Sequence, residues 1–121
     1  MTNNEILLGH SPDADEAFMF YALINEKVST RGYQIRRILQ HTQSLNERAM
    51  RQELDITTIS IHAYAYIKSN YTLLTCGASM GIDYGPIVVA REPMTLEELA
   101  HKQIAVPGTM TTAFLVLRLI L

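Results

Sequence analysis

The sequence contains a single cysteine, Cys76, and no tryptophan. One cysteine excludes an internal disulfide, which fits a reducing compartment. Histidine and cysteine nowhere occur at H-x-x-x-H or C-x-x-C spacing, so we expect no metal centre. Basic residues are also few, because ten Lys and Arg stand against twelve Asp and Glu, for a net charge of −2. A nucleic-acid partner therefore has no electrostatic support.

Long apolar runs are scarce too. The apolar stretch at 111–121 is far shorter than the roughly 20 residues that span a bilayer, and Arg118 interrupts it. The first residues, Met-Thr-Asn-Asn-Glu, carry neither Lys nor Arg and lead into no long apolar segment. A secretory signal is therefore not expected. These absences predict a cytoplasmic protein without a membrane partner.

The chain does have short apolar runs that alternate with helical patterns. Of its 121 residues, 48% are apolar, which is enough for the core of one domain. Capping boxes are predicted at Ser44-x-x-Glu47 and at 95–98. The alternation predicts an α/β fold with a parallel sheet. Strands are expected at 5–9, 33–39, 55–60, 73–79, 86–91 and 103–106, and helices at 15–27, 45–53, 61–69, from 95 and from 112.

Three junctions share one design, namely a strand, a turn of polar or small residues, and a helix start. They lie at 11–15, 60–62 and 108–112. Such junctions place backbone N–H groups at the carboxyl ends of strands, where open α/β sheets bind ligands. Simple helix capping is the alternative explanation for each. If they converge, they form a site for a carboxylate or phosphate. The candidate ligand-binding residues are Ser11, Asp13, Ser60, His62, Gly108, Thr109, Thr111 and Thr112.

Other reactive side chains have two interpretations each. His10 and His62 either face a ligand or pack in the interior. Asp13 and Asp15 either cap the first helix or form an acid–base pair. Cys76 lies in an apolar run and is expected in the core rather than as a nucleophile.

Three segments resemble one known family. They are residues 10–23 (HSPDADEAFMFYAL), 82–89 (IDYGPIVV) and 104–113 (IAVPGTMTTA). Their motifs are similar to those of 1,4-dihydroxy-6-naphthoate synthase and the chorismate dehydratase-like proteins of the futalosine route to menaquinone. The three segments occur in the same order as in that family and are spread over the whole chain.

The resemblance implies a type II periplasmic-binding-protein fold, in which two α/β lobes hold the ligand in the cleft between them. Residues 1–86 would form the first lobe, and 87–121 the crossover and the beginning of the second. The resemblance also implies a lyase that binds a small carboxylated substrate and needs no obvious cofactor. The family's proposed catalytic histidine would lie beyond Leu121, so no histidine of this chain inherits its role.

The first turn departs from the family pattern. Asp-Ala-Asp-Glu stands at 13–16, where the synthase has Cys-Pro-Asn-Asp. Extra carboxylates would repel an anionic substrate unless donors bind them or they turn away. The departure favours a different ligand. It also leaves an alternative function, a solute-binding protein of the same fold that holds a small anion without chemistry.

The apolar run at 111–121 is the last unusual feature. As a helix it would need burial on every side, and no Gly, Asn or Pro stop signal follows it. We therefore expect the chain to stop inside a helix whose packing partners lie further on, and to be inactive by itself. Otherwise a homodimer must cover these side chains.

Overall fold

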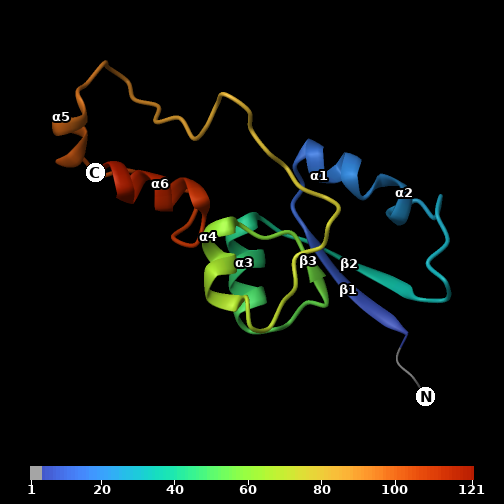
Figure 1. Ribbon diagram of the computed structural model, residues 1–121. Helices are drawn as coiled ribbons and strands as arrows, with labels where there is room; N and C mark the ends of the chain where they lie inside the picture. Colours follow the sequence, from blue (N-terminus) through green and yellow to red (C-terminus); the bar gives the residue numbers. More distant parts are fainter. Residues whose placement is uncertain (1–3) are drawn as a thin grey trace.

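The structure, a computed structural model, describes residues 4–121. Its centre is a three-stranded parallel sheet in the order β2-β1-β3 (Figure 1). The strands are β1 (Glu5–His10), β2 (Gln34–Leu39) and β3 (Ile56–Thr57). β1 lies in the middle and its last three residues are buried. An apolar run flanked by two partners is typical of a buried parallel strand. The predicted parallel α/β arrangement is confirmed for this part of the chain.

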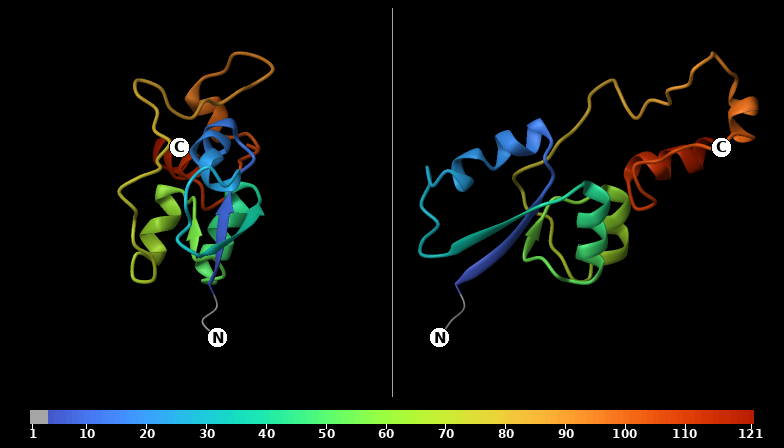
Figure 2. Two further views of the ribbon diagram at one scale, coloured as in Figure 1. Left: turned by 90° about the vertical axis from the view of Figure 1, so that its right-hand side faces the viewer. Right: turned by 180° about the vertical axis from the view of Figure 1, so that it is seen from behind.

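Helices cover both faces of the sheet (Figure 2). The first two lie over the face that carries His10 and Leu39, because their residues line a cavity with both. The third lies on the opposite face, where Leu45 approaches Gly9, and the fourth packs beside it. The last helix contacts the fourth. The helices are α1 (Ala14–Met19), α2 (Tyr21–Ile24), α3 (Thr42–Met50), α4 (Ile61–Ile67), α5 (Leu96–Ala100) and α6 (Thr112–Ile120).

The core is small and centres on α3 and α4. Leu45 and Ala49 of α3 and Ala63 of α4 have no exposed surface. Burial of such side chains provides most of the stability of short helices, because helices of this length are marginal by themselves. The buried apolar residues are Leu8, Leu45, Ala49, Leu54, Ala63, Ile67 and Leu99.

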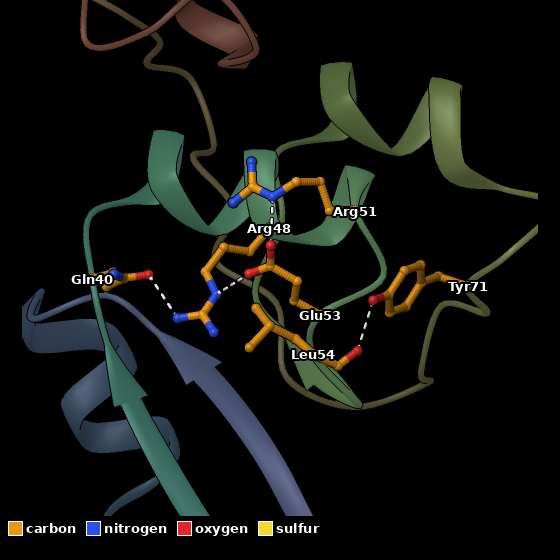
Figure 3. A network of polar contacts seen from close by, with 6 residues as sticks. All are labelled: Gln40, Arg48, Arg51, Glu53, Leu54 and Tyr71. Carbon is orange, nitrogen blue, oxygen red and sulfur yellow. Dashed lines mark hydrogen bonds and ion pairs between the residues drawn. The ribbon is translucent and has the colours of Figure 1, made fainter.

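A polar network holds the end of α3 against the following loop (Figure 3). The carboxylate of Glu53 forms ion pairs with Arg48, at 2.9 Å, and with Arg51, at 2.5 Å. Arg48 also donates to the side chain of Gln40, at 3.4 Å. The hydroxyl of Tyr71 donates to the carbonyl of Leu54, at 2.6 Å. These contacts join the chain before α3, the chain after it and the loop that follows α4.

Three of the expected strands are wrong. Residues 73–79, 86–91 and 103–106 form no strand in the described part of the chain. Ile87 and Val89 are 83% and 89% exposed. β-branched residues favour strands because they pack against neighbouring strands, and without a neighbour the preference has nothing to act on. Cys76 is exposed as well, so its expected place in the core is wrong.

Two helix predictions also need correction. The helix expected at 15–27 is broken at Phe20, whose backbone (φ −96°, ψ 2°) is not helical, and it ends at Ile24. The capping box expected at Ser44 does not form, because α3 already begins at Thr42 with His41 as its N-cap. The helix after Ser60 is confirmed, with that serine at the N-cap position.

α6 does not achieve the burial that its apolar sequence calls for. Within residues 4–121 only its first turns lie against other elements, and Leu119 and Ile120 are 77% and 58% exposed. None of the helices described reaches the length and apolarity that a bilayer crossing needs. The apolar side chains at the end of α6 therefore lie open to solvent.

The capping box predicted at α5 is confirmed. The Glu98 amide donates to the Thr95 hydroxyl, at 3.2 Å, and the Thr95 amide donates to the Glu98 carboxylate, at 2.8 Å. The backbone N–H of Thr95 and then its hydroxyl hold the pKa of Glu98 below its ordinary value.

We expect acid to open this box. A carboxyl whose pKa is lowered by folding stabilises the folded state above its ordinary pKa, and this stabilisation is lost as the pH falls through the lowered value. The amide resonance of Thr95 should therefore titrate at a pH below the ordinary pKa of a glutamate, as followed by NMR. Glu98→Gln keeps an acceptor but removes the charge, so the titration step should vanish. A step that persists in this variant would show that another group is responsible.

Candidate functional site

The first junction follows β1 and is closed by its own carboxylates. Ser11 is 1% exposed. Its amide donates to Oε2 of Glu16, and its hydroxyl donates to Oδ2 of Asp13, at 2.8 Å. The amide of Asp13 donates back to the Ser11 hydroxyl, at 3.2 Å. Both donors of Ser11 are thus engaged within the turn. The sequence leaves two outcomes for these carboxylates, repulsion of an anion or binding to donors, and in the structure Asp13 and Glu16 are bound to donors.

Asp15 lies at the start of α1 and faces a different segment. A hydrogen bond from the Ser79 side chain, followed by the backbone N–H of Glu16, lowers the pKa of this carboxyl. Asp15 and Ser79 line an open cavity of about 450 Å³ together with Met19 and Met80. Asp13 occupies the N-cap position of α1, but its side chain accepts no capping bond from that helix. The two aspartates therefore have separate partners and do not form a pair.

His10 lies deep beside this junction. It is 2% exposed, and its ring centroid lies 5.2 Å from that of Phe20. Nδ1 donates to the carbonyl of Ser11, at 2.7 Å, because a carbonyl can only accept. Nε2 is buried without a partner among residues 4–121. The ring borders a cavity of about 270 Å³ beneath α1 and α2. Its burial favours the interior interpretation.

The second and third junctions lie against each other. His62, in the first turn of α4, donates from Nδ1 to the carbonyl of Thr111, at 3.2 Å. Its backbone amide lies 3.4 Å from Oγ1 of Thr112. Since Nδ1 carries the proton, Nε2 holds a lone pair, and the hydroxyl of Tyr66 lies 3.5 Å from it. Segments 49 and 50 positions apart in the chain thereby meet at one place.

Asn46 of α3 forms hydrogen bonds to both turns. Its side chain has no exposed surface. Oδ1 accepts from the amide of Ser60, at 3.0 Å, while Nδ2 donates to the Ser60 hydroxyl, at 3.0 Å, and to the carbonyl of Met110, at 3.3 Å. One turn earlier on α3, Gln43 accepts from the amide of Met110, at 3.0 Å. Both backbone polar groups of Met110 are therefore held by α3.

The turn before α6 depends on Gly108. Its φ of +154° lies in the region that favours glycine, and a Cβ there would collide with the Gln43 side chain. Thr111, 6% exposed, donates from Oγ1 to the carbonyl of Gly108, at 2.7 Å, and caps α6 by accepting from the amide of Phe114, at 3.3 Å. Thr109 is exposed. The conformation of this turn therefore requires both Gly108 and Thr111.

The first junction is tied to the other two through the end of β3. Oε2 of Glu16 accepts from the hydroxyl of Thr58, at 3.0 Å. Thr58 lies two residues before Ser60, the residue that Asn46 binds. The structure therefore places all three predicted junctions near the carboxyl end of the sheet. The sequence prediction missed Gln43, Asn46, Glu16 and Thr58. A signal existed only for Asn46, a polar residue at helical spacing with buried Ala49.

The paired turns offer several groups to a ligand. The hydroxyl hydrogens of Ser60 and Thr112 are not used in the bonds described above, because both oxygens act there as acceptors. The amides at the start of α6 carry the positive end of a nine-residue helix. Nε2 of His62, which lies 3.5 Å from the Tyr66 hydroxyl, adds an acceptor. This combination suits a small molecule with a carboxylate and a hydroxyl.

These features define an α/β protein in which two polar strand–turn–helix junctions and the turn before α6, which no strand precedes among the described residues, gather at one end of a parallel sheet. The chain belongs to the menaquinone biosynthesis family, because the model of that family matches residues 6–121. A 1,4-dihydroxy-6-naphthoate synthase of Thermus thermophilus is 38% identical over 112 residues, which cover 93% of this chain and 40% of that protein. A 1,4-dihydroxy-6-naphthoate synthase of Streptomyces coelicolor is 29% identical over 119 residues, which cover 98% of this chain and 41% of that protein.

A crystal structure of an Archaeoglobus fulgidus protein is also similar. It has 44% sequence identity and a TM-score of 0.89, and the match covers 98% of this chain and 44% of that one. The chain thus spans about two fifths of the length of the relatives it matches.

Proposed function

We propose that this chain binds a small carboxylated substrate at its paired turns, as part of a menaquinone-pathway lyase similar to 1,4-dihydroxy-6-naphthoate synthase. One observation carries the proposal, which is the contact of His62 with the carbonyl of Thr111 and the hydroxyl of Thr112. That contact gathers hydroxyl donors, a helix N-terminus and an imidazole nitrogen at one place. The family membership supports the same pathway.

The proposed binding mode follows from charge and geometry. A carboxylate would accept from the Thr112 hydroxyl and the first amides of α6, where the helix dipole favours an anion. A hydroxyl of the same molecule would donate to Nε2 of His62 in place of the exposed Tyr66 hydroxyl, which lies 3.5 Å from that nitrogen. Ser11 and Asp13 would contribute shape rather than donors, because their polar groups are bound to one another.

We also propose the two-lobed, type II periplasmic-binding-protein arrangement for the complete enzyme. Residues 1–86 would belong to the first lobe and 87–121 to the beginning of the second. All three strands and helices α1 to α4 precede residue 86, while α5 and α6 follow an extended stretch (Figure 1). The greater length of the relatives leaves room for the remainder of a second lobe.

Calorimetric titration with 1,4-dihydroxy-6-naphthoate tests the proposal. We expect saturable binding, and no binding of 1,4-dihydroxynaphthalene, which has the same rings without the carboxylate. Thr112→Val should weaken binding of the naphthoate about tenfold or more, because a hydrogen bond to a charged group contributes roughly 1.5–3 kcal/mol. Thr72→Val is the matched control, since Thr72 is exposed in the loop that follows α4 and lies outside the paired turns. Unchanged affinity in Thr112→Val would remove that residue from the site.

A non-catalytic solute-binding protein is the second candidate function. It is favoured by the first junction, where Asp13 and Glu16 occupy the donors of Ser11. Amino acids and simple anions should then raise the thermal unfolding midpoint, whereas the naphthoate should not. That pattern would refute the lyase proposal.

A further inference from the structure

We propose that Asn46 is a positioning residue that locks the turn before α6 against the turn before α4 and so sets the spacing of the ligand-binding groups. The inference rests on the proposed function. It concerns a residue on α3 that itself does not reach the site, because its side chain is fully buried.

Every polar atom of the Asn46 side chain is hydrogen-bonded to one of the two turns. Oδ1 accepts from the amide of Ser60, and Nδ2 donates to the Ser60 hydroxyl and to the Met110 carbonyl. Met110 lies 64 positions further along the chain. The bond to Ser60 leaves the hydroxyl hydrogen of that serine free to point away from the helix, toward a ligand.

The partners of Asn46 distinguish it from a residue that only fills space. Filling the same space with an apolar side chain would avoid the cost of burying an amide, which is repaid only when every polar atom finds a partner. Asn46 has such partners, and each belongs to a turn that carries candidate ligand-binding residues. Gln43 reinforces the arrangement one helical turn earlier by binding the Met110 amide. The rigid α3 thus acts as the common support of two segments that are remote in sequence.

Two variants and one control test the inference on the full chain. Asn46→Leu removes every bond and keeps the same branched heavy-atom skeleton. Asn46→Asp keeps the acceptor for the Ser60 amide but replaces the donor to Met110 by a carboxylate oxygen. Leu8→Ala is the control, because Leu8 is a buried residue of β1 outside both turns. Amide hydrogen exchange at residues 108–112 and affinity for 1,4-dihydroxy-6-naphthoate are both measured.

We expect exchange at 108–112 to accelerate about tenfold or more in both Asn46 variants at pH 7, with a parallel loss of affinity. Leu8→Ala should lower the unfolding midpoint but leave the affinity and the local exchange at 108–112 unchanged. In Asn46→Asp, the amides at 108–112 should regain protection on acidification. Protection here means the exchange rate relative to the intrinsic rate at the same pH. Once it is protonated, the introduced carboxyl has a hydrogen that it can donate to the Met110 carbonyl.

The two proposals fail separately. If the parent chain binds no naphthoate, the proposed function is wrong, but exchange at 108–112 still decides whether Asn46 locks the turns. If Asn46→Asp folds with unchanged exchange and affinity, or shows no recovery in acid, the positioning role is refuted. Should Asn46→Leu fail to fold, the aspartate variant and its acid recovery still give the decision.

Discussion

Gly108→Ala should lower the free energy of unfolding by about 2–4 kcal/mol and should disrupt the turn before α6. Two costs add. A φ of +154° strains any residue with a side chain, at about 1–3 kcal/mol. The new Cβ would also lie 2.5 Å from Cδ and 2.6 Å from Cβ of Gln43, so Gln43 must move and release the Met110 amide. Loss of that bond adds about 1 kcal/mol.

The chain offers two matched controls for this prediction. Gly32 has a φ of +90° with nothing within 4 Å of the place a methyl group would take, so Gly32→Ala should show strain without collision. Gly85 also has open space and no positive φ, so Gly85→Ala should be close to neutral. Chemical denaturation followed by circular dichroism gives the three values. If Gly108→Ala costs no more than Gly32→Ala, the contact with Gln43 is not tight.

The same variant should impair ligand binding beyond its effect on stability. Gly108 precedes Met110, whose backbone is held by Gln43 and Asn46. Shortening Gln43 to alanine in the Gly108→Ala background should remove the contact with Cδ of Gln43 but keep the one with its Cβ, so only part of the stability should return. A fully additive double variant would contradict this explanation.

Local patterns were sufficient to predict the first half of the fold. β1 carries its apolar run between polar turns, β2 lies within the strand expected at 33–39, and α4 begins after Ser60 as expected. Patterns failed where a strand needs a neighbour from elsewhere. Ile87 and Val89 have strong β-propensity, yet they stay exposed because no strand among the described residues pairs with them. Propensity describes a surface suited to packing and cannot provide the packing partner.

The candidate site was predictable in part for the same reason. Ser60, His62 and Thr111 stand next to helix starts, so their sequence context indicates their place. Nothing in the sequence links α3 to residue 110, since a contact across 64 positions depends on the whole chain path. The engagement of Ser11 by Glu16 was also invisible, because capping and self-engagement use the same residue types.

Leu45→Ala should be among the most damaging truncations in the core, at about 2–5 kcal/mol, because a side chain with no exposed surface leaves a cavity. The helix carrying Leu45 approaches β1 closely because Gly9 lacks a side chain. A Cβ on Gly9 would lie 2.9 Å from Cδ2 of Leu45 and 2.8 Å from Cδ1 of Leu54. Gly9→Ala alone should therefore overpack the core, at about 1–3 kcal/mol.

Combining the two substitutions should cost less than their sum, because the methyl group at position 9 enters the space that Leu45 vacates. The compensation should be incomplete, since Leu54 still crowds that methyl group. Leu99→Ala is the control partner, because Leu99 lies on α5, away from β1, and should add independently to Gly9→Ala. The midpoints of guanidinium unfolding, compared at a constant m-value, give the coupling free energy between the two substitutions. Strict additivity of Gly9→Ala with Leu45→Ala would mean that α3 does not pack on β1 through this contact, and α3 would then lose its role as the fixed support of both turns.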